Sequence, residues 1–113
     1  MTLVRHDHPD ACVVTASGRI DHANADTFLA SLQAVLGSLE RRRPLVLDFS
    51  AVDYISSAGL RALMVAARQA KVAGCPVGIA NLQPLVHEVF SIARFELIVP
   101  GFDSIEAAIK GLA

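Results

Sequence analysis

The sequence predicts an α/β fold, with a mixed sheet of about four to five strands and about four helices packed against it. Two observations support this prediction. Short β-rich runs alternate with segments whose apolar residues recur at helical spacing, and the first two runs lie close enough together for a hairpin. The sheet should therefore begin antiparallel and continue parallel. The 113 residues are enough for one compact domain with a single core, which we expect to span residues 1–113.

The first expected element is a β-hairpin. Residues 3–7 and 11–17 are short runs of β-forming residues, separated by His8, Pro9 and Asp10. Proline and aspartate between two such runs are typical of a turn.

A first helix is expected within residues 21–40. Asn24 or Asp26 could cap its start, since each offers a side-chain oxygen to free backbone N–H groups. The large apolar residues recur at spacings of three and four, as one amphipathic stripe requires. They are Phe28, Leu29, Leu32, Val35, Leu36 and Leu39.

Residues 45–49 form an apolar run without alternation, which predicts a central strand covered on both faces. From Leu60 the period becomes helical, and Gly74 followed by Pro76 predicts the end of that helix. The expected buried face of the helix consists of Leu60, Leu63, Met64, Ala67 and Ala70.

The last third of the chain predicts a strand at 77–80, a helix, a small strand at 97–99 and a closing helix. Asp103 and Glu106 could form the cap of the closing helix. The helix between the two strands should carry one apolar stripe, which consists of Leu85, Val86, Val89, Phe90 and Ala93.

Composition narrows the classes of function. Hydrophobic residues make up 53% of the chain and charged residues 19%, which is typical of a folded globular protein. The formal net charge of -1 leaves no strong electrostatic footprint for nucleic acid or an anionic membrane. The N-terminus lacks a signal-peptide pattern, and no apolar stretch approaches the roughly 18 to 20 residues that span a bilayer. We therefore expect a soluble cytoplasmic protein without direct membrane insertion.

Catalytic and metal-binding patterns are weak throughout. The chain has no glycine-rich phosphate loop, and "ISSAGL" lacks the pattern of a hydrolase nucleophile elbow. Cys12 and Cys75 are far apart without CxxC spacing and are expected to be buried thiols. The four scattered histidines do not provide a metal site. We expect no enzymatic activity, no metal and no cofactor. These histidines are His6, His8, His22 and His87.

The basic run Arg41-Arg42-Arg43 precedes the central strand. It is either a solvated loop or a patch that faces a partner.

Ser56 and Ser57 stand between the central strand and the helix that follows it. The free N–H groups and the dipole at a helix N-terminus stabilise an anion, so a phosphate on Ser57 would be compatible with the fold. Asp53, together with Asp21 if the loops cluster, would then make this surface strongly acidic. Serine before a helix can also be an ordinary N-cap.

The segment "LVLDFSAVDYISSAGLRALMVAARQAKVAG" resembles the signature of STAS domains, the sulphate-transporter and anti-sigma-factor-antagonist family. "CVVTASGRIDHANADTF" resembles the second strand, the Gly-x-[Leu/Ile]-Asp turn and the first helix of that family. "GCPVGIANLQPLVHEVFSIARFELIVPGFDSIEAAI" resembles its last strands and helices. The resemblance covers nearly the entire chain and implies a free-standing STAS-like sandwich.

The resemblance also implies a function. Small free-standing members of the family are anti-sigma factor antagonists in partner-switching systems. They bind a serine kinase of the ATPase type that doubles as an anti-sigma factor. The kinase inactivates them by phosphorylating a loop serine, and a protein phosphatase restores them. Aligned on Gly59 and Leu60, the acceptor position falls on Ser57. Ser56 replaces the family aspartate and Ala58 the second hydroxyl, so Ser56 could be a helix cap or an alternative acceptor.

A partner surface is therefore expected around the serine pair, extended by the outward stripe of Arg61, Val65 and Arg68. The runner-up is a STAS subunit of a lipid-transporting ABC transporter, which docks on the ATPase without phosphorylation control. Ser57 argues against that alternative, and the substitution at Ser56 argues mildly for it. A ligand-binding sensor would need a cavity. The predicted partner-binding residues are Asp21, His22, Asp53, Ser56, Ser57, Gly59 and Arg61.

Overall fold

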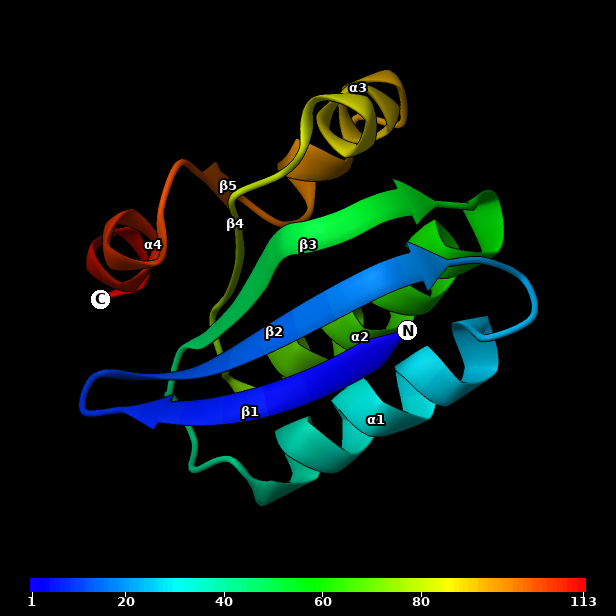
Figure 1. The fold of residues 1–113 in the computed structure, drawn as a ribbon. Helices are drawn as coiled ribbons and strands as arrows, with labels where there is room; N and C mark the ends of the chain where they lie inside the picture. The colour runs from blue at the N-terminus through cyan, green and yellow to red at the C-terminus, as the bar shows by residue number, and fades with distance from the viewer.

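The computed structural model describes residues 1–113 and shows one five-stranded sheet with four α-helices (Figure 1). The order of elements agrees with the α/β prediction. The elements are β1 (Thr2–His8), β2 (Ala11–Ile20), α1 (Ala25–Ser38), β3 (Leu45–Ile55), α2 (Ser57–Ala73), β4 (Val77–Ala80), α3 (Pro84–Ile92), the 3-10 helix η1 (Phe95–Leu97), β5 (Gly101–Phe102) and α4 (Ile105–Leu112).

The strands lie in the order β1-β2-β3-β4-β5, with β3 in the centre as the sequence predicts. The pair β1 and β2 is antiparallel, and every other neighbouring pair is parallel. Strand β3 is much longer than the predicted 45–49 because it continues to Ile55 alongside β2. Strand β4 pairs only with residues 45–48 of β3. The second half of β3 therefore extends past β4 and carries its C-terminal loop to one end of the molecule.

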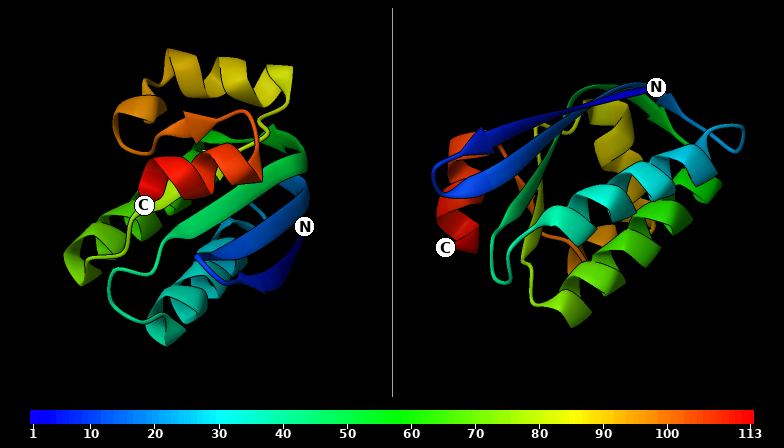
Figure 2. Two further views of the ribbon diagram at one scale, coloured as in Figure 1. Left: turned by 90° about the vertical axis from the view of Figure 1, so that its left-hand side faces the viewer. Right: turned by 90° about the horizontal axis from the view of Figure 1, so that it is seen from below.

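Helices cover the two faces of the sheet unequally. Helices α1 and α2 lie side by side on one face, and α4 lies on the other (Figures 1 and 2). The larger core lies between the sheet and α1 and α2, where Phe28, Leu32 and Leu63 are buried against β2 and β3. A smaller apolar cluster joins Val13, Val46 and other small residues to Ala108 of α4. Alternate residues of β2 and β3 thus point to opposite faces of the sheet and fill the two cores.

The predicted buried face of α2 is largely correct, but most of the residues that are fully buried are smaller than the predicted ones. Gly59, Ala62, Leu63, Ala66 and Ala70 are buried, while Leu60, Met64 and Ala67 are half-buried. The helix ends at Gly74 as predicted, with Gly74 in the left-handed region at φ 76°. None of the helices is both long and apolar enough to span a membrane.

The predicted strand at 97–99 is wrong. The chain reverses at Arg94, which has a φ of 54°, then forms η1 and pairs as β5 only at Gly101–Phe102. Phe95 and Val99 are buried four residues apart, and Phe95 packs against Phe90 with ring centroids 5.0 Å apart. An apolar triplet has no period of its own, so its composition did not reveal this helical turn.

The caps of two helices also differ from the predictions. At α4 the N-cap is Ser104 rather than Asp103, and its hydroxyl accepts a hydrogen bond from the Ala107 N–H at 3.0 Å. At α1, Asn24 occupies the N-cap position, but its side chain makes no capping hydrogen bond. Asp26 lies within the first turn. The Asn24 side chain is used in the preceding turn instead.

Candidate functional site

The loop between β3 and α2 is a single residue, Ser56, which is anchored on both sides. Its hydroxyl accepts a hydrogen bond from the Gly59 N–H at 3.1 Å and thereby caps α2. Its backbone N–H donates to the carbonyl oxygen of Ile20, at the end of β2, over 2.8 Å. Of the two roles considered for Ser56, the structure therefore shows the helix cap.

Ser57 is the first residue of α2 and is exposed. None of the side-chain hydrogen bonds in the structure involves its hydroxyl. The backbone N–H groups of a first helical turn have no partner four residues earlier, and they form the positive end of the helix dipole. The Ser57 hydroxyl thus lies free, beside backbone groups that favour a negative charge.

Gly59 is buried and holds α2 close to the sheet. A Cβ atom at this position would lie 2.8 Å from side-chain atoms of both Ile20 and Ile55. Such separations are shorter than van der Waals contact, so a larger residue would force the start of α2 away from β2 and β3. Gly59 was predicted as a partner-binding residue; the structure gives it a packing role that positions Ser57.

The turn between β2 and α1 forms the neighbouring part of the site. The Asp21 N–H donates to Asn24 Oδ1 at 2.9 Å, and the Ala23 N–H donates to Asp21 Oδ1 at 3.0 Å. The Asn24 amide in turn donates to the Arg19 carbonyl at 2.8 Å. Asp21 and Asn24 are therefore engaged in shaping a tight turn, which leaves His22 exposed at its tip.

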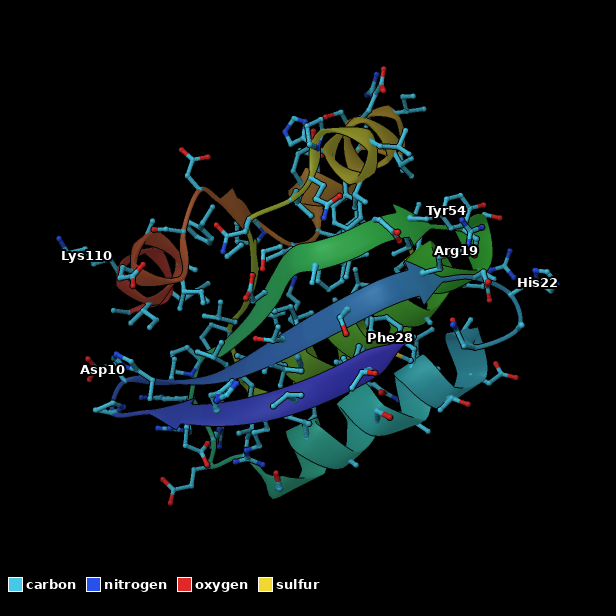
Figure 3. The ribbon with its side chains drawn as sticks, viewed as in Figure 1. Asp10, Arg19, His22, Phe28, Tyr54 and Lys110 are labelled. Carbon is cyan, nitrogen blue, oxygen red and sulfur yellow. The ribbon has the colours of Figure 1, made fainter.

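Because β2 and β3 are parallel, the turn after β2 and the loop after β3 lie at the same end of the sheet. The Arg19 guanidinium lies 4.1 Å from the centre of the Tyr54 ring, a cation–π contact between the two strands. Figure 3 shows Arg19, Tyr54 and His22 at this end, opposite the β1–β2 turn at Asp10. Asp53 is exposed near the end of β3, and Arg61 is exposed one helical turn after Ser57.

A buried carboxylate that the sequence analysis did not identify lies in the first half of β3, away from the serine pair. Asp48 Oδ1 accepts hydrogen bonds from the Asn81 amide and the Ser50 N–H, each at 3.1 Å, and Oδ2 accepts from the Thr15 hydroxyl at 3.4 Å. Burial by itself would raise the pKa of Asp48, but these hydrogen bonds outweigh it and lower the pKa below the ordinary value. The only signal in the sequence was a charged residue inside an apolar strand.

A cleft of about 610 Å³ opens at the carboxyl ends of β4 and β5. Asn81, Gln83, His87 and Asp103 contribute polar groups to it. Gln83 is held there by a 2.8 Å hydrogen bond to the Ser50 carbonyl. The size lies within the usual range of small-molecule sites. Fewer than half of the residues that line this open cleft are hydrophobic, so it is not a cavity in the apolar interior of the kind that a ligand-binding sensor would need.

The fold and site define a small α/β domain that presents a free serine at the first turn of the helix after its central strand. A family model described as "Mlab, STAS domain" matches residues 4–100. The candidate anti-sigma factor antagonist BtrV of Bordetella bronchiseptica is 40% identical over 96 residues, which cover 85% of this chain and 81% of BtrV. The chain belongs to the STAS domain family.

Two solved structures extend the comparison. An anti-sigma factor antagonist from Mycobacterium paratuberculosis has a TM-score of 0.81 and 25% identity, covering 98% of this chain and 92% of that one. A candidate antagonist from Thermotoga maritima has a TM-score of 0.87 and 18% identity, covering 97% and 93%. The second comparison concerns the fold alone. Together they confirm the predicted STAS-like sandwich.

Proposed function

We propose that this chain is an anti-sigma factor antagonist whose binding to an anti-sigma serine kinase is ended by phosphorylation of Ser57. The antagonist names of BtrV and of the mycobacterial structure support the general role. The kinase of the ATPase type and the phosphatase that would reverse the modification are inferred from the family resemblance.

The observation that carries the proposal is the different use of the two serines. The Ser56 hydroxyl is engaged as the cap of α2, and its backbone is bonded to β2. Ser56 is half-buried, and a kinase would have to break the hydrogen bond of its hydroxyl with the Gly59 N–H to reach it. The Ser57 hydroxyl is exposed and makes no hydrogen bond, so a kinase can reach it without opening the fold.

The charges around Ser57 suit a switch of this kind. A phosphate adds roughly -1.5 to -2 charges at neutral pH. The first turn of α2 and the Arg61 guanidinium one turn later can hold this charge, so the domain stays folded. Asp21 and Asp53 would then make the same end of the molecule strongly negative. A partner that fits the unmodified surface would be repelled by the modified one.

We propose that the kinase contacts the exposed and half-buried groups at this end, which we call the serine surface. It consists of Asp21, His22, Asp53, Ser57 and Arg61. Ser56 and Gly59 support this surface from below, through the α2 cap and the close approach of α2 to Ile20. The two supporting residues affect binding by placing Ser57.

The proposal is tested by affinity capture from host lysate with wild type, Ser57→Ala and Ser57→Asp, followed by mass spectrometry. An anti-sigma serine kinase should be retained by wild type and Ser57→Ala and lost by Ser57→Asp. Incubation of the captured kinase with ATP should phosphorylate wild type on Ser57 and leave Ser57→Ala unmodified. Equal retention of the kinase by all three forms, or modification mapped to Ser56, would contradict the proposed switch.

A second candidate is docking on the ATPase of a lipid-transporting ABC transporter without phosphorylation control. It is favoured by one feature of the site, the use of Ser56 as a cap where the family resemblance places an aspartate. The same capture distinguishes the two functions. A transporter ATPase retained equally by wild type and Ser57→Asp would support this second candidate.

A further inference from the structure

A groove of about 520 Å³ lies between the second half of α2 and the end of η1 with the two residues that follow it. Ala67, Arg68 and Lys71 of α2 line it, together with residues 97–99. Pro76 and Val77, where the chain enters β4, also line it. The groove is about 20 Å from Ser57 along the axis of α2, given a rise of about 1.5 Å per residue.

Six of the ten residues that line this groove are hydrophobic, and two of these are exposed. Leu97 is 79% exposed and Ile98 is 44% exposed, and both line it. Two of the six large apolar side chains that are exposed thus line the same groove. Clustered rather than scattered apolar exposure marks an interaction surface.

The rim of the groove is positively charged. Arg68 and Lys71 line it. Neither of these cations takes part in an ion pair, and no acidic residue lines the groove. In a chain with a net charge of -1, this is a local excess of positive charge.

The structure also separates the three arginines of the basic run. Arg43 is half-buried and donates hydrogen bonds to the carbonyl oxygens of His8 and Ala11, at 2.7 and 3.1 Å. It therefore holds the β1–β2 turn. The Arg41 side chain lies against Gly74 at the end of α2, with its Nε 3.3 Å from where a Cβ would stand. The run is thus partly structural.

We propose that this groove binds an acidic peptide segment of a protein partner, with one or two large apolar side chains in the groove and carboxylates on its rim. Exposed apolar side chains beside two cations match a segment in which Leu, Ile, Met or Phe is flanked by Asp or Glu. Two cations at one groove do not form the extended basic stripe that nucleic acid requires. The site is separate from the serine surface, so a second partner can bind whatever the state of Ser57.

The probe is a random dodecapeptide library displayed on phage and selected on the immobilised full chain. Selected peptides are then synthesised with a fluorophore, and their affinities are measured by anisotropy. We expect enrichment of Asp and Glu next to large apolar residues, with affinity that falls as salt is raised. Amide chemical-shift changes should map to residues 67–77 and 97–99.

Matched variants test the two halves of the proposal. Lys71→Glu should weaken binding of a selected peptide about tenfold, whereas Lys110→Glu should not change it. Lys110 is also a lysine in the last turn of its helix, but α4 lies on the opposite face of the sheet (Figure 3). Leu97→Ser should weaken binding about tenfold, whereas Ile92→Ser, at an equally exposed apolar residue outside the groove, should not. Ser57→Asp should leave the affinity unchanged.

Three outcomes would overturn the proposal. One is selection of peptides without acidic enrichment, and another is equal binding of selected peptides to wild type, Lys71→Glu and Leu97→Ser. The third is co-sedimentation with phosphatidylglycerol–phosphatidylcholine vesicles that is lost in Lys71→Glu, which would assign the patch to an anionic membrane. Because all the substituted residues are exposed, circular dichroism should show that every variant folds.

Discussion

The two ends of α2 are built in opposite ways. At its start the helix follows β3 after a single residue, is capped by Ser56 and packs against Ile20 and Ile55 through Gly59. At its end it stops at Gly74 and borders a groove that apolar residues, Arg68 and Lys71 line. The start is closely packed with one free hydroxyl on it, and the end is open. One helix can therefore support a covalent switch and a docking site without either disturbing the other.

The largest expected effect concerns the close packing at the start of α2. Gly59→Ala should lower the free energy of unfolding by about 1–3 kcal/mol, because its Cβ overlaps side chains at the ends of two strands. Urea denaturation followed by circular dichroism measures this change. The matched control is Gly37→Ala in α1, where a Cβ would meet nothing within 4 Å. That control should raise stability by about 0.5–1 kcal/mol. Equal effects of the two substitutions would show that the start of α2 is not closely packed.

The glycine at the other end of α2 tests a conformational requirement instead of a steric one. Gly74 has a φ of 76°, and Gly74→Ala should lower the free energy of unfolding by about 1 kcal/mol because L-residues with a Cβ avoid this region. Gly74→Asn should cost less, because asparagine tolerates the left-handed conformation. Denaturant midpoints of the two variants provide the comparison. A Gly74→Asn variant less stable than Gly74→Ala would exclude this explanation.

The two serines should separate stability from regulation. Ser56→Ala should lower the free energy of unfolding by about 1 kcal/mol through loss of the α2 cap. Ser57→Ala should change it by less than about 0.5 kcal/mol, since its hydroxyl is exposed and makes no hydrogen bond. Thermal unfolding of both variants in one buffer tests this difference. A cost for Ser57→Ala as large as that for Ser56→Ala would remove the distinction on which the proposed switch depends.

Acid should act on the sheet and leave the cap of α2 unaffected. The pKa of Asp48 is lowered in the folded chain, so its contribution to stability is present above the unfolded pKa of about 4 and is lost as the pH falls through the lower folded pKa. The free energy of unfolding should therefore decrease below about pH 4, and less so in Asp48→Asn. The cost of Ser56→Ala should stay constant over this range. Urea titrations at several pH values measure both, and an unchanged acid dependence in Asp48→Asn would contradict the role of Asp48.

Local patterns predicted most elements because each pattern reports only the residues within it. The hairpin, the stripe with Phe28 and Leu32, the central strand and the Gly74 stop were all confirmed. The failures were also local in origin. The polar residues Ser50 and Asp53 interrupt the apolar run, so the sequence does not indicate that the buried strand continues to Tyr54. Pairing with β2 nevertheless keeps this segment extended. Residues 97–99 were apolar without a period, and so were assigned to a strand.

The candidate site shows the same limit. Ser56 and Ser57 were placed correctly between a strand and a helix, but their chemical difference was not evident from the sequence. It depends on the cap geometry and on the contact of Ser56 with Ile20, which is 36 positions earlier in the chain. Asp48 was hidden in an apolar strand, because its partners Thr15 and Asn81 come from other parts of the chain.

The sequence by itself determined the order of strands and helices and the presence of a hydroxyl at the start of α2, because periodicity and capping chemistry are local. The tertiary structure alone decided which serine is free, that Gly59 meets Ile20, and that Leu97 lines a groove with Lys71. These contacts join residues distant in the chain. They depend on strand order and register, which bring the ends of several elements to the same place.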